Sequence, residues 1–188
     1  MSASLAGRRL LVSAGPTYED IDPVRFLGNR SSGKMGFAVA AVAAERGAEV
    51  TLVAGPVHLP TPEGVRRLDV RSAAQMFAAV MDQLADGQPP CDAYIGAAAV
   101  ADFTPRSFAD NKLKKTPGQD TLVLELVKTR DILAEVAAHA RRPGLVVGFA
   151  AETNDLSTYA RDKLERKRLD LICANRVGVA GCGFESDE

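Results

Sequence analysis

Residues 28–36, which read GNRSSGKMG, nearly match a phosphate-binding loop. In the P-loop pattern G-x-x-x-x-G-K-[ST], backbone amides and the lysine bind phosphates, and the final hydroxyl binds Mg²⁺. Met35 replaces that hydroxyl, and a thioether is a poor ligand for a hard cation that prefers oxygen. The sequence therefore predicts either an accidental match or a loop that binds an anion in a different way.

The residues around this loop favour an anion site. An apolar run at residues 10–12 leads into the turn sequence SAGPT, which is typical of a strand that ends in a tight turn. Residues 35–44 have a helical pattern that ends near Gly47, and Ser31 and Ser32 are expected to cap its start. Such a helix points free amides and the positive end of its dipole at the loop.

Two lysines near the end of the chain could also bind an anion. At about 100° per residue, Lys163 and Lys167 lie within about 20° of Leu156 on the wheel of a predicted helix. That face is apolar and packed. Two ammonium groups there need either extended stems that reach water or an anionic partner.

Three further candidates lie in loops and at a strand end. Lys112, in the sequence KLKK, could clamp a polyphosphate or a carboxylate, or it could belong to a solvated charged segment. Asp102 ends the apolar run at residues 93–102, where a carboxylate can orient a substrate, bind a metal or cap a turn. The amide of Asn29 can donate to a carbonyl oxygen or stabilise its own loop.

These candidates are distributed over alternating strands and helices. After the first strand and helix, we expect strands at residues 48–55, 65–70, 93–102, 121–128, 145–151 and 169–174. We expect helices at residues 72–87, 131–140 and 155–168. The alternation predicts a Rossmann-like, mostly parallel sheet with helices on both faces, a three-layer α/β/α fold. Ligands bind at the carboxyl ends of such strands, where one crevice could collect Gly15, residues 98–102, residues 149–152 and Asn175.

Composition excludes several other classes of protein. With 188 residues and 46% hydrophobic content, the chain is expected to form one domain with a substantial core. A net charge of −1 argues against a nucleic-acid partner. No apolar run approaches the roughly 18 residues that span a bilayer, and no signal-peptide pattern is present, so we expect a cytoplasmic protein without a membrane partner. Three Cys and two His, without metal-ligand spacing, argue against a zinc site or a disulfide framework.

Six ordered motifs, together with the elements above, resemble phosphopantothenoylcysteine synthetase. They are DPVRF at 22–26, NRSSGKMG at 29–36, AAVADF at 98–103, KLKK at 112–115, GFAAET at 148–153 and DLICAN at 170–175. The resemblance covers about residues 10–188, and in bacteria this domain usually forms the C-terminal half of a bifunctional flavoprotein. It implies a single synthetase domain at residues 1–188, truncated at the C-terminus relative to the family, with the flavin decarboxylase domain absent.

The resemblance implies a ligase of coenzyme A biosynthesis. The family joins 4′-phosphopantothenate to L-cysteine, and its bacterial members use CTP, which implies an acyl-cytidylate intermediate with release of pyrophosphate and then CMP. CTP and Mg²⁺ are the implied co-substrate and cofactor, and a homodimer is the implied assembly. The Mg²⁺ ligands are left open.

The resemblance also implies roles for individual residues. Asn29 would polarise the acyl carbonyl, and Lys112 would stabilise the nucleotide phosphates. The implied nucleotide-binding set is Gly15, Ser31, Gly33, Gly36, Ala98, Asp102, Lys112, Asp131, Ile132, Leu133, Phe149, Lys163, Lys167 and Asn175. The implied substrate-binding set, in which Arg25 would come from the neighbouring subunit, is Arg25, Asn29, Ala98, Ala99 and Asp102. Thr129 and Arg130 replace an Asn-Pro pair usual in bacterial relatives, so base recognition there is expected to differ.

Two other functions are open at this point. The first is a nucleotide-binding module without catalysis, which the expected truncation would favour. The second is an NAD(P)-dependent oxidoreductase on a Rossmann-like sheet. The sequence GPT at residues 15–17 does not fit the G-x-G-x-x-G fingerprint of such enzymes.

Overall fold

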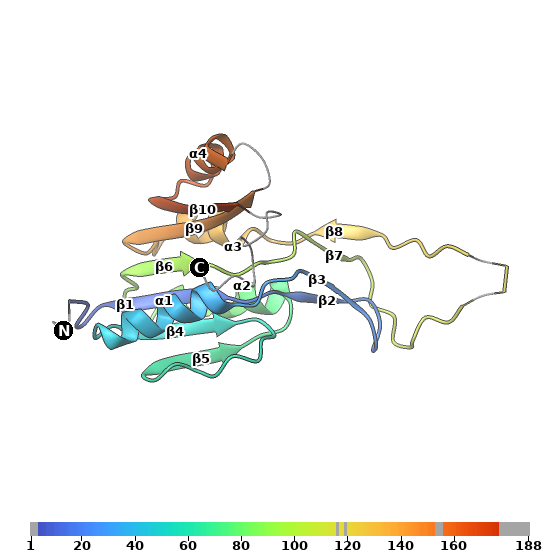
Figure 1. Ribbon diagram of the computed structural model, residues 1–188, viewed down its shortest axis with the longest axis horizontal. Helices are drawn as coiled ribbons and strands as arrows, with labels where there is room; N and C mark the ends of the chain where they lie inside the picture. The colour runs from blue at the N-terminus through green and yellow to red at the C-terminus, as the bar shows by residue number, and fades with distance from the viewer. Residues whose placement is uncertain (1–3, 116, 119, 153–155, 177–188) are drawn as a thin grey trace.

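The main sheet of the computed structural model has six parallel strands in the order β10-β9-β6-β1-β4-β5 (Figure 1). The structure describes residues 4–115, 117–118, 120–152 and 156–176. The strands are β1 (Arg9–Ala14), β4 (Glu49–Ala54), β5 (Val65–Asp69), β6 (Ala93–Gly96), β9 (Leu145–Glu152) and β10 (Leu171–Arg176). Because β1 lies between β4 and β6, Leu11 pairs with Thr51 on one side and Tyr94 on the other. The predicted Rossmann-like sheet is confirmed.

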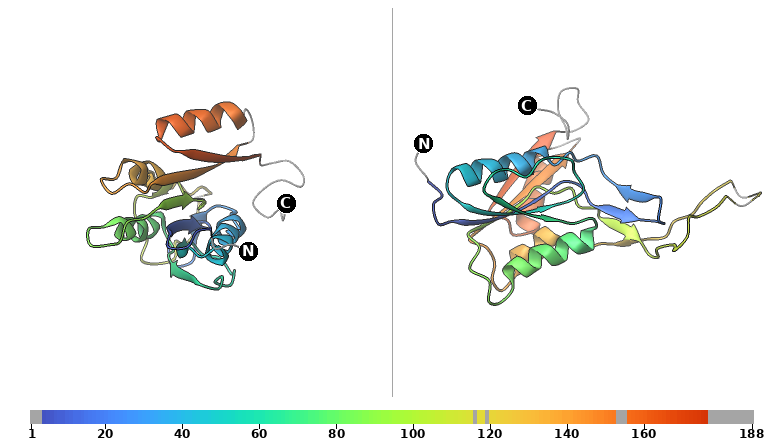
Figure 2. Two further views of the ribbon diagram at one scale, coloured as in Figure 1. Left: turned by 90° about the vertical axis from the view of Figure 1, so that its left-hand side faces the viewer. Right: turned by 90° about the horizontal axis from the view of Figure 1, so that it is seen from below.

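Helices cover both faces of this sheet, which gives the expected three layers (Figure 2). The helix α1 (Lys34–Glu45) packs on one face through Phe37 against Val12 and Leu52. The helices α2 (Ala73–Leu84) and α3 (Ile132–Ala138) pack on the other face. The helix α4 (Leu156–Arg166) lies along β9 and β10, and its Leu164 joins the core of the α2 and α3 face.

The start of α1 differs from the sequence prediction. Gly33, with a φ of 78°, is the N-cap residue, and no side chain caps the helix. The expected serine cap was therefore wrong. A Cβ at Gly33 would lie 3.3 Å from the Cα of Gly15, so the backbone approaches β1 more closely than a serine N-cap would allow. Ser31 instead accepts a bond from the Gly33 amide at 3.4 Å.

Two predicted strands are shorter than expected. The strand β6 ends at Gly96, because its neighbour β1 ends at Ala14 and the chain then turns at Gly15 with a φ of 81°. The next amides bond to the end of β1 and to the turn after it: the Ala97 amide donates to the Ser13 carbonyl at 3.0 Å, and the Ala99 amide donates to the Gly15 carbonyl at 2.8 Å. Of the strand expected at residues 121–128, only β8 (Leu126–Lys128) is present.

Two small antiparallel sheets project beyond the carboxyl end of the main sheet (Figure 1). One pairs β2 (Tyr18–Asp20) with β3 (Phe26–Gly28), and the other pairs β7 (Phe103–Pro105) with β8. We call these sheets and their connections, residues 17–28 and the described part of 103–128, the arm. A 3.0 Å bond from the Ala109 amide to the Ile21 carbonyl joins its two parts. The sequence patterns did not predict the arm.

Candidate active site

A cavity of about 410 Å³ lies where β1, β6 and β9 end at the base of the arm. From β1 the chain adds β4 and β5 on one side, and then crosses to add β6, β9 and β10 on the other. Open α/β sheets bind ligands at the carboxyl side of this switch point. The lining residues are Ser13, Tyr94, Gly96, Ala98, Val100, Asp102, Phe103, Lys128, Thr129, Arg130, Asp131, Ile132, Leu133, Phe149, Lys163 and Lys167.

Two lysines reach this cavity: Lys163 in α4, and Lys167 directly after the end of α4. The Nζ of Lys163 donates to the Phe149 carbonyl at 2.7 Å. The Nζ of Lys167, whose side chain is 15% exposed, lies 2.7 Å from the Oδ2 of Asp131. Lys167 thus has an anionic partner, one of the two alternatives that the sequence left open, whereas the bond of Lys163 is to a neutral carbonyl. An ammonium group has three donors, so the Asp131 bond leaves Lys167 able to bind a ligand as well.

Asp131 has a structural task in addition to the ion pair. Its Oδ1 accepts a bond from the Ala134 amide at 3.1 Å, which caps the start of α3. Burial opposes ionisation of this carboxyl, but the Lys167 ammonium and the Ala134 amide outweigh it and hold the Asp131 pKa below its ordinary value. The carboxylate is therefore charged at neutral pH and fixes Lys167 beside the first turn of α3.

A hydroxyl pair lies on the β1 and β6 side of the cavity. The hydroxyl groups of Ser13 and Tyr94 are 2.9 Å apart, and both residues are buried. Burial raises the pKa of Tyr94 to about 12, although the Ser13 bond opposes the shift and the Asp131 charge adds to it. Tyr94 is thus a neutral hydrogen-bonding group in the lining of the cavity. The sequence did not identify it, because Tyr94 lies inside an uninterrupted apolar run.

The turn after β8 fixes the segment that carries Asp102. The hydroxyl of Thr129 donates to the Ala101 carbonyl at 2.6 Å, and its amide donates to the Asp102 carbonyl at 3.0 Å. The guanidinium of Arg130 lies 3.6 Å from the centre of the Phe77 ring. At the position where the resemblance implied an Asn-Pro pair, this chain therefore has a threonine that joins two segments and a stacked arginine.

Asn29 lies beside the cavity without lining it. Its Nδ2 donates to the Ala99 carbonyl at 2.7 Å, and its Oδ1 accepts from the Ser31 amide at 3.2 Å. Ala98, the neighbour of Ala99, does line the cavity. The Asn29 amide thus lies one residue from the lining of the cavity and is oriented by a backbone carbonyl.

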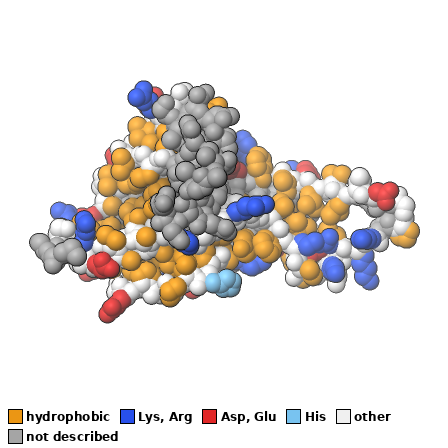
Figure 3. Space-filling model, in the orientation of Figure 1, with side chains coloured by type: hydrophobic (Ala, Val, Ile, Leu, Met, Phe, Trp, Pro, Cys, Tyr) orange, Lys and Arg blue, Asp and Glu red, His pale blue; other side chains and the backbone are white. Residues whose placement is uncertain are grey.

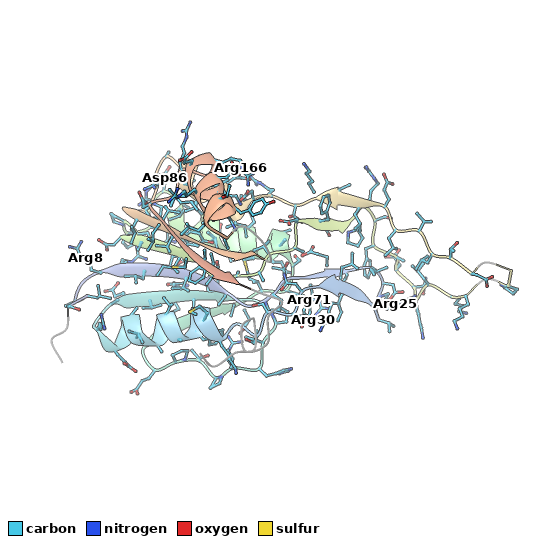
Figure 4. All side chains as sticks on the ribbon, turned by 45° about the horizontal axis from the view of Figure 1, so that its top comes forward. Arg8, Arg25, Arg30, Arg71, Asp86 and Arg166 are labelled. Carbon is cyan, nitrogen blue, oxygen red and sulfur yellow. The ribbon has the colours of Figure 1, made fainter. Side chains whose placement is uncertain are left out.

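Arg25 and Lys112 lie on the arm. Figure 4 shows Arg25 beyond the end of the main sheet, where its guanidinium binds Asp22 and the Leu113 carbonyl. Lys112 is exposed on the segment between β7 and β8. Neither residue lines the cavity of its own chain.

The cavity therefore brings together only part of the expected site. It gathers Ala98, Asp102, Asp131, Ile132, Leu133, Phe149, Lys163 and Lys167. Outside its lining are Gly15, Arg25, Asn29, Ser31, Gly33, Gly36, Ala99 and Lys112. The side chain of Asn175 lies outside the described residues. Sequence reasoning missed Ser13, Tyr94, Gly96, Phe103, Lys128 and, as cavity residues, Thr129 and Arg130. The polar run at 128–131 before a predicted helix was the available signal for the last three.

The described residues contain neither a metal-binding cluster nor a membrane-spanning helix. No group of three or more His, Cys, Asp or Glu there is arranged to hold a metal ion. No helix in the described part of the chain has the length and apolar character needed to cross a membrane.

Comparisons with known proteins show the family of this chain. A family model described as the DNA/pantothenate metabolism flavoprotein C-terminal domain matches residues 5–188. The chain is 55% identical over 184 residues to the coenzyme A biosynthesis bifunctional protein CoaBC of Vibrio cholerae serotype O1. The match covers 98% of this chain and 45% of that protein, so the chain spans less than half of the relative.

Solved structures share the fold. The crystal structure of the C-terminal domain of a CoaBC protein matches with a TM-score of 0.78 and 41% identity, covering 93% of this chain and 79% of that one. A Cab2 variant in complex with phosphopantothenate-cysteine matches with a TM-score of 0.74, covering 90% of this chain and 73% of that one. At 18% identity, the second match shows the fold alone.

Proposed function

Because this chain belongs to the DNA/pantothenate metabolism flavoprotein C-terminal domain family, we propose that it is a phosphopantothenate–cysteine ligase. The proposed reaction joins 4′-phosphopantothenate to L-cysteine with CTP, in the cytoplasm, as a step of coenzyme A biosynthesis. The observation that carries the proposal is the cavity at the switch point, where Lys163 and Lys167 lie beside the first turn of α3.

The proposed chemistry needs cations more than a nucleophilic side chain. In the first step, a carboxylate oxygen of phosphopantothenate attacks the α-phosphorus of CTP, and the bond to the β-phosphate breaks to release pyrophosphate. Charge grows on the departing oxygen, and lysines can stabilise it there. In the second step, the cysteine amine attacks the acyl carbon, loses a proton and expels CMP. Neither step requires a covalent enzyme intermediate.

We assign the described residues to these steps by position. Lys163 and Lys167 would bind the nucleotide together with the backbone of residues 131–133 and with Phe149. Asn29 would hold the acyl carbonyl beside Ala99, where its amide already donates to a backbone oxygen. Lys112 would approach the phosphates from the arm.

A Mg²⁺ ion bound to the nucleotide fits this donor set. Mg²⁺ often binds through one or two carboxylates together with substrate phosphates, and it keeps several waters. The Asp102 side chain offers one carboxylate in the cavity and is exposed. The ion would supply charge neutralisation of the triphosphate, and Asp102 is the residue that we propose to contact it.

We also propose that the arm forms a homodimer contact. Large apolar side chains are exposed along it, among them Phe108 at 53%, Leu122 at 56% and Val123 at 87%. Figure 3 shows apolar and basic side chains side by side on the arm. A contact through the arm would bring Arg25 toward the partner's cavity, in keeping with its proposed role there.

A coupled assay tests the function directly. The protein is incubated with CTP, phosphopantothenate and Mg²⁺, pyrophosphate is measured, and L-cysteine is then added. We expect pyrophosphate release before cysteine is present and CMP release afterwards. Binding of CTP without pyrophosphate release would instead support the module without catalysis, and preferential binding of NADPH would support the oxidoreductase.

Two variants separate the steps. Asn29→Asp should accumulate the acyl-cytidylate and form little product, because the amide donor to the acyl carbonyl is lost. Lys112→Gln should suppress formation of the intermediate. Equal loss of both steps in Asn29→Asp would show a binding role, and normal pyrophosphate release in Lys112→Gln would remove that lysine from the catalytic set.

A further inference from the structure

Asp22 is a buried carboxylate on the arm. Its side chain is 0% exposed, although the arm projects into solvent. The Oδ1 accepts the amides of Val24 and Arg25 at 2.9 and 2.8 Å. The Oδ2 accepts the Nε of Arg25 at 3.0 Å, its NH2 at 2.6 Å and the Leu113 amide at 3.0 Å. The Oδ1 thus stabilises the local turn at residues 22–25, and the Oδ2 joins this turn to the distant segment that contains Leu113.

Asp22 and Arg25 together hold Leu113 at two points. While Asp22 accepts the Leu113 amide, the NH2 of Arg25 donates to the Leu113 carbonyl at 2.7 Å. Leu113 is 91 residues from Asp22 and 88 residues from Arg25 in the sequence. We call this arrangement of Asp22, Arg25 and Leu113 the clasp. Leu113 is half-buried, and its neighbours Lys112 and Lys114 are exposed.

Electrostatics favours a charged clasp. Burial opposes ionisation of Asp22, but the bonds from Arg25 and from the amides of Leu113 and Val24 hold its pKa well below the ordinary value. A buried carboxylate that loses such donors is strongly unfavourable. The segment that carries Lys112 is therefore fastened at the neighbouring Leu113, in addition to the bond from the Ala109 amide to the Ile21 carbonyl, although residues 106–125 contain no strand or helix in their described part.

We propose that Asp22 is a positioning residue that, through the clasp, sets where Lys112 presents its ammonium group. This inference rests on the proposed function, in which Lys112 stabilises the nucleotide phosphates. It goes beyond that function by assigning a role to Asp22 and a structural role to Arg25 within its own chain.

The isosteric variant Asp22→Asn breaks the clasp selectively. Only one oxygen remains, so an NH₂ group must face either the two turn amides or the three donors at the former Oδ2. Amide hydrogen exchange of overlapping peptides that contain Leu113 reports the result. We expect exchange at Leu113 to accelerate by at least about tenfold. The matched control is Asp110→Asn, an exposed carboxylate on the same segment, which should leave exchange unchanged. Unchanged exchange in Asp22→Asn would overturn the clasp.

A double-mutant cycle tests whether Asp22 acts through Lys112. Asp22→Asn should slow pyrophosphate release at saturating CTP by about tenfold, while the KM for CTP changes little, because the cavity lies apart from the clasp. In the Lys112→Gln background, Asp22→Asn should have no further effect. A purely structural role would instead give the same loss in both backgrounds, and that result would overturn the proposal.

The two readouts separate this inference from the proposed function. If the unsubstituted protein releases no pyrophosphate, the proposed function fails, whereas hydrogen exchange still decides whether the clasp exists. If Asp22→Asn does not fold, Arg25→Lys replaces it, because lysine lacks the planar fork that bridges Asp22 and Leu113. Exchange at Leu113 should again accelerate, and unchanged exchange would refute the clasp.

Discussion

The side chain of Lys167 is mostly buried beside α4, and the carboxylate of Asp131 stabilises its charge there. The ion pair is 2.7 Å long, and the Asp131 carboxylate also caps α3. The sequence could predict that Lys163 and Lys167 lie on the same helical face, because helical geometry fixes their direction. It could not predict their partners, since Asp131 and the Phe149 carbonyl lie on other elements and approach only in the folded chain.

Substitution of Lys167 tests whether this cation binds the nucleotide. We expect Lys167→Gln to raise the KM for CTP by roughly tenfold or more, because a charge-assisted bond to a phosphate contributes about 1.5–3 kcal/mol. The control is Arg166→Gln, whose side chain is 65% exposed and pairs with Asp162 on the same helix. Steady-state kinetics decides, and equal KM values for both variants would remove Lys167 from the nucleotide site.

The pH dependence of stability tests the Asp22 carboxylate. Its pKa in the folded protein lies below the ordinary value of 3.8, so its stabilising effect is complete above that value and is lost as the pH falls through the folded pKa. We therefore expect the Tm difference between the unsubstituted protein and Asp22→Asn to be largest near neutral pH. It should shrink on acidification to about pH 3 and below. Thermal unfolding monitored by circular dichroism gives both values, and a difference independent of pH would contradict the assignment.

At the scale of elements, the contact between α1 and β1 depends on the absence of side chains. The pattern of residues 35–44 predicted the helix, but the way it begins depends on how closely β1 approaches. A Cβ on Gly36 would lie 2.4 Å from the Cβ of Ala14. At the start of α1, the backbone of Gly36 therefore packs directly against the side chain of Ala14 in β1. A local sequence pattern cannot predict how closely two separate elements approach.

Gly36→Ala tests this packing, because the expected sign is opposite to ordinary helix propensity. Replacing glycine by alanine inside a helix usually stabilises it by about 0.5–1 kcal/mol. Here the new methyl group would overlap Ala14, and overpacking costs about 1–3 kcal/mol. We expect a lower Tm for Gly36→Ala. The comparison is Ala38→Gly at an exposed position of α1, which should show only the ordinary loss of propensity. A higher Tm for Gly36→Ala would show that α1 can move away from β1.

At the scale of the whole molecule, the sequence predicted the layers of the main sheet and missed the arm. The sheet follows from repeated apolar runs, each of which is local. The arm is built from short strands, and its two parts join through contacts such as the one between Asp22 and Leu113. The strand β2 pairs with β3, and β7 pairs with β8. Each of these strands has 3 residues, which is too short for a periodic pattern to predict it. For the same reason, the sequence could place Lys112 in a loop but could not relate it to Arg25.

The exposed apolar side chains of the arm predict how the molecule assembles. Val123, which is 87% exposed, would be buried against the partner subunit in the proposed dimer. Burial of a valine side chain contributes roughly 1.5 kcal/mol or more, and an aspartate there would add the cost of burying a charge. We expect Val123→Asp to weaken self-association by at least about tenfold in sedimentation velocity.

The control for this prediction lies on the opposite part of the molecule. Val42 on α1 is 46% exposed, so Val42→Asp introduces the same charge at an apolar surface position away from the arm. It should leave association unchanged. Because Arg25 is on the arm and not at its own cavity, Val123→Asp should also reduce ligase activity at protein concentrations where the dimer dissociates. Activity that is independent of protein concentration in a monomeric Val123→Asp variant would show that each chain completes its own site.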